Sequence, residues 1–148
     1  MTKIFDTSSV NETEALAEKL GRILKSGDVI AYKGSMGMGK TAFTRGLARG
    51  LEITDDVSSP TFALVNEYGG NKLTLYHFDM YRVEGYEDLY STGFFDYLDM
   101  GGIIAIEWSE NIEDCLPNNT ISITISQTGE NSRRITIEGD DRLEDISC

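Results

Sequence analysis

The stretch Gly34-Ser35-Met36-Gly37-Met38-Gly39-Lys40-Thr41 fits the pattern G-x-x-x-x-G-K-[ST] of a P-loop, which holds the phosphates of a nucleotide. Its glycines let the backbone curl, because glycine adopts positive φ angles at little cost. The curl turns successive N–H groups inward and forms a nest for an anion. Lys40 is expected to reach the β- and γ-phosphates, and the Thr41 hydroxyl to bind Mg²⁺. The alternative is a glycine-rich turn that matches by accident.

The residues on either side of this stretch favour the P-loop interpretation. A P-loop follows a strand and opens a helix. The run 28–32 is apolar and β-prone, and 41–51 is typical of a helix with Phe43, Leu47 and Leu51 on one face. The positive end of that helix would face the phosphates. Strand, loop and helix together predict the first unit of an α/β fold.

Length and charge limit the possible classes of protein. The 148 residues indicate one domain, 1–148, with an acidic tail over 139–148 that we expect to be frayed. No apolar run approaches the roughly 20 residues of a membrane span, and the N-terminus lacks the apolar region of a signal peptide. We therefore expect a cytoplasmic protein that does not enter a membrane. The net charge of −12 disfavours tight binding of nucleic acid by the chain alone, because phosphate contacts supply most non-specific affinity.

The remaining periodicities predict a mixed sheet. Ser9 and Glu12 form a capping box before a helix expected over 10–25. Two strands around Gly69-Gly70-Asn71 predict a hairpin, which makes the sheet mixed rather than purely parallel. Further elements are expected at 86–90, 94–98, 102–108 and 111–116, and a second hairpin at 120–126 and 134–138. We predict a P-loop NTPase-like three-layer α/β fold with a mixed central sheet and a C-terminal antiparallel hairpin.

Two acids, Asp79 and Glu107, each end a predicted strand. Carboxylates at such positions beside a P-loop manage Mg²⁺ and the attacking water. We favour Glu107 on the metal, directly or through water, and Asp79 on the attacking water. The alternative is that Asp79 contacts the metal-bound waters.

Other side chains leave more than one interpretation open. His77, the single histidine, is expected to be a packed core residue, whereas Trp108 lines the nucleotide pocket or a partner surface, or packs in the core. The segment 58–62 is either a strand-start turn or a switch-like loop near the γ-phosphate. Arg82 is more often an ion-pair partner than a phosphate ligand, and a C-terminal arginine, Arg133 or Arg134, could approach the base or ribose.

The motifs in chain order resemble those of the TsaE (YjeE) family, small bacterial ATPases of tRNA threonylcarbamoyladenosine biosynthesis. The resemblance is carried by the P-loop and by four further blocks, Ser59-Pro60-Thr61-Phe62, Asn66-Glu67-Tyr68, His77-Phe78-Asp79-Met80-Tyr81-Arg82 and Ile106-Glu107-Trp108. The family's P-loop usually reads G-D-L-G-A-G-K-T. Ser35 here replaces the acid, which puts any role of that carboxylate in doubt.

The resemblance implies an ATPase that uses Mg²⁺ and works with the proteins TsaD and TsaB on adenosine 37 of tRNAs that read ANN codons. The tRNA would be reached only through that complex, and hydrolysis would be slow alone and faster with the partner. ATP is preferred over GTP because no N-K-x-D motif is present. The implied catalytic residues are Lys40, Asp79 and Glu107, and the implied metal residues are Thr41 and Glu107. The implied nucleotide contacts are Thr13, Met36, Gly37, Met38, Gly39, Lys40, Thr41, Ala42, Trp108 and Arg134.

Two other functions remain open at this point. One is a nucleotide-gated binding module in which hydrolysis is incidental. The other is a small-molecule kinase. The lack of an arginine-rich lid segment in the sequence counts against it.

Overall fold

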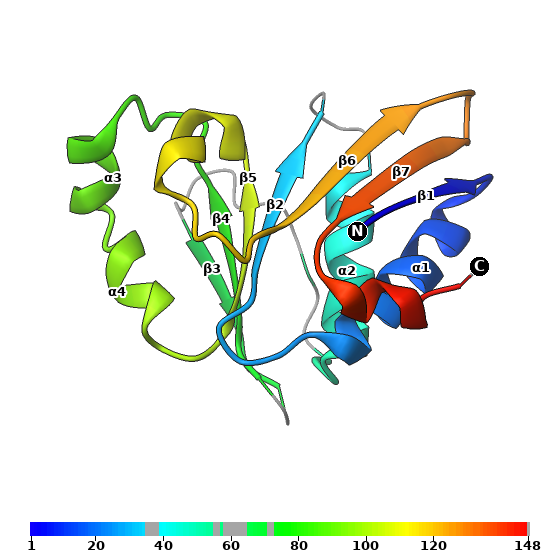
Figure 1. Cartoon of the computed structure of the whole chain (residues 1–148), viewed down its shortest axis with the longest axis horizontal. Coiled ribbons are helices and arrows are strands. Elements are labelled where there is room, and N and C mark those ends of the chain that lie inside the picture. Colours follow the sequence, from blue (N-terminus) through cyan, green and yellow to red (C-terminus); the bar gives the residue numbers. More distant parts are fainter. Residues whose placement is uncertain (35–38, 55–56, 58–64, 71–72, 148) are drawn as a thin grey trace.

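The computed structural model describes residues 1–34, 39–54, 57, 65–70 and 73–147 (Figure 1). Within them, seven strands form one sheet in the order β1-β7-β6-β2-β5-β4-β3. The strands are β1 (Thr2–Thr7), β2 (Val29–Lys33), β3 (Val65–Tyr68), β4 (Leu75–Asp79), β5 (Ile103–Glu107), β6 (Ile121–Gln127) and β7 (Arg133–Glu138). The helices are α1 (Val10–Ile23), α2 (Lys40–Gly50), α3 (Tyr86–Ser91), α4 (Phe94–Leu98) and the 3₁₀ segments η1 (Ser109–Cys115) and η2 (Asp141–Asp145).

The sheet is mixed, as the sequence predicts. Its centre is parallel, because β2 pairs with both β5 and β6, and β5 pairs with β4. Antiparallel strands flank this centre, with β3 on one side and β7 followed by β1 on the other. The central strand β2 is buried on both faces, which explains its unbroken apolar sequence.

Helices cover the two faces of the sheet and create two cores (Figure 1). The larger core lies under α1 and α2 and contains Ile30, Tyr32 and Phe43. The second core lies under α3, α4 and η1 and contains Val29 and Phe78. Neighbouring residues of β2 enter opposite cores because successive strand side chains point to opposite faces. The fold is therefore the expected three-layer, P-loop NTPase-like arrangement.

Glycines let α1 and α2 approach closely. A Cβ atom at Gly46 of α2 would lie 2.3 Å from the main-chain oxygen of Glu14, and one at Gly50 would lie 2.4 Å from that of Glu18. A Cβ at Gly21 of α1 would lie 2.6 Å from the oxygen of Leu47. Real Cβ atoms do not approach this closely, so larger residues would separate the helices. The position of α2, which carries the end of the P-loop, therefore depends on these glycines.

The two ends of the described chain depart from the sequence prediction. The first residues form strand β1, which pairs with β7 and was not predicted. The tail is not frayed over 139–147, because Leu143 and Ile146 are each 1% exposed and join the larger core. Arg142 also donates from its two terminal nitrogens to Asp28, at 2.7 and 3.1 Å. The prediction overlooked this contact, which spans most of the chain.

Candidate nucleotide-binding site

The described part of the P-loop has the backbone that its glycines predict. Gly34 has a φ of 114°, and Gly39 has a φ of 100° as the residue before α2. These left-handed values favour glycine over any other residue. The predicted nucleotide contacts Met36, Gly37 and Met38, and the segment 58–62, lie outside the described residues. Of the remaining P-loop residues, Lys40, Thr41 and Ala42 form the first turn of α2.

The Lys40 side chain lies beside the end of β5. It is 3% exposed, and its Nζ lies 5.5 Å from the centroid of the Trp108 ring. Trp108 is held in the left-handed region, with a φ of 59°, and its ring contacts that of Tyr81 with centroids 4.9 Å apart. A non-glycine residue in this region carries strain of the kind that gathers at functional sites. Trp108 therefore contacts the P-loop lysine and also packs against the second core, and its place in a nucleotide pocket stays a prediction.

Asp79 and Glu107 lie side by side, each at the last position of its strand. They are register partners in the parallel pair of β4 and β5. Leu75 and Ala105 of the same strands belong to the core under α1 and α2, and side chains two positions apart share a face. Both acids therefore point to the face of the sheet that α2 covers. Asp79 also accepts a hydrogen bond from the main-chain N–H of Tyr81 at 2.9 Å, which orients one of its oxygens.

His77 is buried, as the sequence predicts, and it also contacts a site residue. Its Nε2 lies 2.7 Å from Oε2 of Glu107, and the histidine side chain is fully buried. The two atoms are within ion-pair distance, but the ring N–H is not aligned for a good hydrogen bond. Within the described chain neither ring nitrogen has another polar partner. His77 is therefore positioned to hold one oxygen of Glu107.

Buried hydroxyl groups fix β2 against α2 and η1. The Tyr32 hydroxyl lies 2.7 Å from Oγ1 of Thr44 on α2, and Thr44 donates to the main-chain oxygen of Lys40 at 2.8 Å. Ser109, the first residue of η1, donates to the main-chain oxygen of Tyr32 at 2.8 Å. Burial raises the pKa of the Tyr32 phenol, and the negative charge of Glu107 raises it further, while the bond with Thr44 offsets part of the effect. The phenol stays neutral and serves as a structural link.

A small cavity of about 50 Å³ lies where the N-terminus of α1 meets the N-terminus of α2 and the turn between β6 and β7. Its lining includes Thr13, Gly39 and Ala42, three of the predicted nucleotide contacts. Thr13 is held there by its hydroxyl, which lies 2.8 Å from that of Thr7. The structure therefore brings these residues from distant parts of the sequence to one place.

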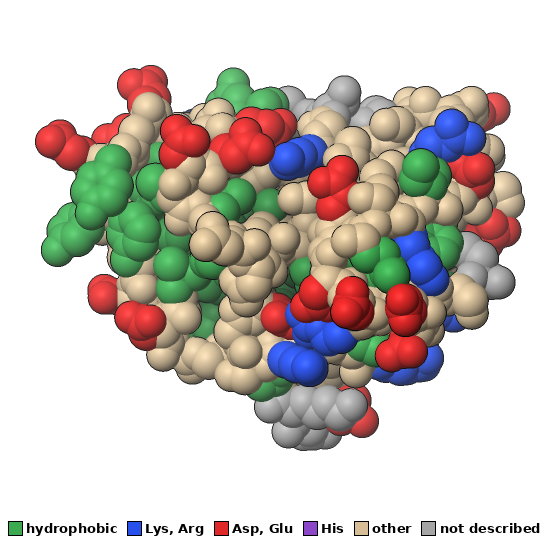
Figure 2. All heavy atoms as spheres, viewed as in Figure 1, with side chains coloured by type: hydrophobic (Ala, Val, Ile, Leu, Met, Phe, Trp, Pro, Cys, Tyr) green, Lys and Arg blue, Asp and Glu red, His purple; other side chains and the backbone are tan. Residues whose placement is uncertain are grey.

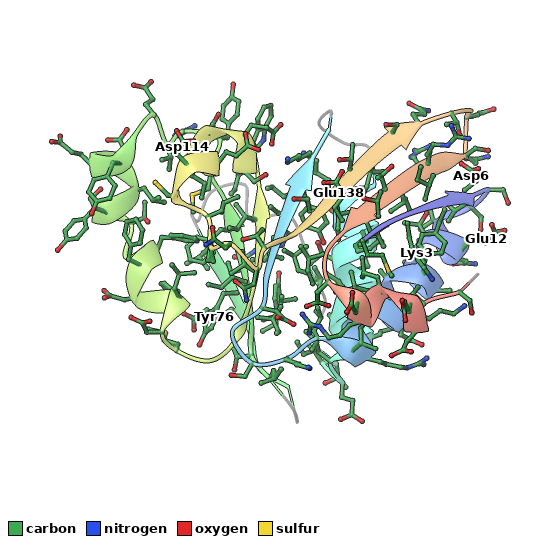
Figure 3. The ribbon with its side chains drawn as sticks, in the orientation of Figure 1. Lys3, Asp6, Glu12, Tyr76, Asp114 and Glu138 are labelled. Carbon is green, nitrogen blue, oxygen red and sulfur yellow. The ribbon has the colours of Figure 1, made fainter. Side chains whose placement is uncertain are left out.

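The arginine at this cavity is Arg133 and not the predicted Arg134. Arg133 lines the cavity, whereas Arg134 pairs with Asp6 of β1, with its Nε 2.9 Å from the carboxylate. Asp6 lies at the outer edge of the sheet (Figure 3). The two arginines are neighbours on β7, so their side chains point to opposite faces. Asn131 also lines the cavity and was not predicted.

The side chains at the strand ends suit Mg²⁺ in the presence of phosphates. This ion takes oxygen ligands, typically one or two carboxylates together with phosphate oxygens and waters. Asp79 and Glu107 supply carboxylates, and Thr41 supplies a hydroxyl at the start of α2. Among the described residues, no group of three or more His, Cys, Asp or Glu side chains could hold a metal without such help. The set is therefore incomplete until a phosphate joins it.

Known proteins resemble this chain over most of its length. The family model described as "Threonylcarbamoyl adenosine biosynthesis protein TsaE" matches residues 7–135. A Bacillus subtilis protein named tRNA threonylcarbamoyladenosine biosynthesis protein TsaE is 42% identical over 131 residues, which are 88% of this chain and 81% of that protein. A protein of the same name from Nostoc is 40% identical over 93% of this chain and 85% of its own length. The crystal structure of Bacillus subtilis YdiB superposes with a TM-score of 0.81 at 34% identity, and covers 99% of this chain and 91% of its own.

Proposed function

The chain belongs to the TsaE family of threonylcarbamoyl adenosine biosynthesis proteins, and from this premise we propose that it binds Mg-ATP at the site around Lys40 and hydrolyses it. The purpose of the hydrolysis would be to support formation of threonylcarbamoyladenosine on tRNA. The observation that carries the proposal is the pair Asp79 and Glu107, which end neighbouring parallel strands on the face covered by the P-loop helix.

Each residue has a physical role in this proposal. The Lys40 ammonium balances charge on the β- and γ-phosphates, and the buried position of the side chain strengthens that attraction. The Thr41 hydroxyl and the Glu107 carboxylate hold Mg²⁺, which neutralises charge on the phosphates when it is bound. His77 keeps Glu107 in place. Asp79 orients the attacking water, with Tyr81 N–H fixing the carboxylate.

The adenosine end of ATP would enter the cavity between α1, α2 and the β6–β7 turn. Thr13 and Ala42 line that cavity, and Arg133 brings a positive charge to it. A cavity of about 50 Å³ is smaller than a nucleoside, so it would hold only part of the adenosine.

We further propose that TsaB and TsaD are the partners and that hydrolysis is slow without them. Arg82 is exposed and forms no hydrogen bond or ion pair with the described residues, so it is not held against the phosphates. An arginine finger is worth about 10³–10⁵ in rate in related enzymes. A partner that supplies such a group would raise turnover. Because the relatives are named for tRNA modification, we place this activity in the cytoplasm.

The test separates binding from turnover. Asp79→Asn should depress phosphate release while ATP affinity stays within about threefold of wild type, because a residue that acts on water acts mainly in the transition state. Glu107→Gln should instead weaken the Mg²⁺-dependent part of ATP binding. Lys40→Ala should lose nucleotide affinity outright. ATP binding by Lys40→Ala at wild-type affinity would contradict the P-loop assignment, and phosphorylated small molecules among the products would favour a kinase.

A further inference from the structure

The side of the molecule that holds α3 and α4 carries mainly negative charge. Every charged side chain between residues 83 and 132 is acidic. This segment builds α3, α4, β5, η1 and β6. Figure 2 shows the consequence, since the side of the molecule that holds α3 and α4 has red and green side chains without blue ones. In this view the Lys and Arg side chains lie toward α1 and the chain ends, apart from Lys33 of β2, which borders η1 and pairs with Glu113.

The same side exposes aromatic rings that contact one another. Tyr86 and Tyr90 of α3 are 62% and 67% exposed, and their rings stack with centroids 6.3 Å apart. The Phe95 ring of α4 lies 5.6 Å from Tyr86 and 6.4 Å from Tyr90. Phe95 is anchored in turn on the buried ring of Phe94, with centroids 5.7 Å apart. We call Tyr86, Tyr90 and Phe95 the aromatic patch.

An acidic hollow adjoins the aromatic patch. It has a volume of about 370 Å³ between the start of α3 and η1, and Tyr86 lines it. The acids of its lining are Glu84, Glu110, Glu113 and Asp114. Asp114 lies on η1 at the side of α3 (Figure 3). Glu113 is paired with Lys33 at 3.2 Å, whereas the other three acids form no ion pair within the described residues. Exposed rings beside unpaired carboxylates are suited to a ligand that is both cationic and partly apolar.

We propose that the aromatic patch and the acidic hollow together form a docking surface for a protein partner that presents arginine or lysine beside apolar side chains. A guanidinium group fits both parts, because it stacks on tyrosine rings and pairs with carboxylates. Tyrosine and arginine are also enriched at protein interfaces. The inference rests on the proposed function in one respect, since it takes the TsaB–TsaD complex as the partner that supplies the cations.

Charge decides against two other occupants. RNA would bring phosphates to a surface where acids outnumber the neighbouring cations Lys33 and Arg82, and phosphate contacts supply most non-specific affinity for nucleic acid. A second copy would place one mainly acidic surface against another, and like charges facing each other are unfavourable. A basic protein surface gains from the same field, which also speeds its association.

The aromatic arm of the test compares binding of wild type and of Tyr86→Ser/Tyr90→Ser to the purified TsaB–TsaD complex, by titration calorimetry with ATP and Mg²⁺. The doubly substituted protein should lose at least about tenfold in affinity, as expected for central aromatic anchors. The control is Ile4→Ser, which removes a 61% exposed apolar side chain from β1 at the other end of the sheet. It should bind like wild type. All three proteins should have the same thermal midpoint and the same affinity for ATP.

The charge arm uses Glu110→Lys/Asp114→Lys at the hollow, with Glu144→Lys/Asp145→Lys at η2 as a control of equal charge change away from the hollow. Charge reversal at the hollow should lower the rate of association with the TsaB–TsaD complex. It should also weaken the dependence of that rate on salt, because rim charges act mainly on the association rate. Glu144→Lys/Asp145→Lys should leave both unchanged. Equal binding by wild type and both hollow and patch variants would overturn the docking surface but leave the proposed function intact.

Three further outcomes identify a different occupant or a failed premise. If wild type does not bind the TsaB–TsaD complex at all, the partner in the proposed function is wrong and the docking inference falls with it. If sedimentation shows a dimer that the tyrosine substitutions dissociate, the surface joins two copies of this chain. If those substitutions abolish binding of tRNA, the surface contacts RNA. Either of the last two results overturns the inference.

Discussion

Gly46→Ala should destabilise the protein although alanine is the better helix former. Alanine is favoured over glycine inside a helix by about 1 kcal/mol. Against this, the added Cβ would lie 2.3 Å from the main-chain oxygen of Glu14 and 2.5 Å from Cβ of Ala17. An ordinary contact begins at 3.4 Å, so α1 and α2 would have to separate by about 1 Å. Neither neighbouring atom is the end of a flexible side chain that could move aside.

The steric cost should exceed the gain in helix propensity. Overpacking of a core costs about 1–3 kcal/mol, and a clash with main chain belongs at the upper end of this range. The expected net loss is about 1–2 kcal/mol, which lowers the urea midpoint by about 0.5–1 M for a slope typical of a small protein. Equilibrium unfolding followed by far-ultraviolet circular dichroism measures it. ATP affinity should also fall, because α2 carries Lys40 and Thr41.

Gly69→Ala is the matched control for this substitution. A Cβ at Gly69 would meet no atom within 4 Å, and the backbone there is not left-handed. The free energy of unfolding of Gly69→Ala should match that of wild type to within about 0.5 kcal/mol. A midpoint for Gly46→Ala equal to or above that of wild type would refute the reasoning, since helix propensity would then outweigh the close approach of the two helices.

The remaining predictions concern acid stability and the candidate site. Hydrogen bonds with Arg142 lower the pKa of Asp140 to about 2, so the stability that this carboxylate gives is present above about pH 4 and is lost as the pH falls toward 2. Wild type should therefore be more stable than Asp140→Asn at neutral pH, and the difference between their urea midpoints should disappear as the pH falls from about 4 toward 2. A difference that does not change with pH would contradict the assigned role of Asp140. Arg133→Gln should weaken ATP binding about tenfold, the size of one charge-assisted hydrogen bond, while Arg134→Gln changes it less than twofold. Equal losses in calorimetry would contradict the assignment of Arg133, rather than Arg134, to the ligand. Trp108, the single tryptophan, lies against Lys40, so its fluorescence should change when ATP binds; an unchanged signal at a saturation proved by calorimetry would contradict the placement.

Local patterns predicted the parts of the fold that local physics determines. The P-loop with its strand and helix, both hairpins and the apolar strand ending in Glu107 all have a signal within a short window of sequence. One half of the predicted capping box forms, since Ser9 accepts from the N–H of Glu12 at 3.1 Å. The Glu12 carboxylate, however, bonds to the N–H of Ser8 rather than to that of Ser9.

The parts of the fold that the sequence did not predict depend on contacts between distant residues. β1 buries only Phe5 and Thr7, so its sequence shows little alternation, and its partner β7 lies at the other end of the chain. The tail looked frayed because its acids are conspicuous, whereas the bonds from Arg142 to Asp28 that hold it leave no local pattern. The period of two in β7 did contain one usable signal. Ile135 and Ile137 face the core, so Arg133 had to share their face and Arg134 could not.

The position of β2 in the sheet has a consequence for synthesis of the protein on the ribosome. Helices α1 and α2 are close in sequence and can pack together early, but both neighbours of β2 are translated much later, since β5 begins at Ile103 and β6 at Ile121. Until residues 121–124 have left the exit tunnel, the strand that leads into the P-loop has a free hydrogen-bonding edge. Proteolysis of ribosome-bound chains that end before and after this segment would detect the change. The P-loop is thus made early but gains its rigid support only near the end of translation, and a nascent chain stalled between these points presents an apolar strand to any other chain nearby.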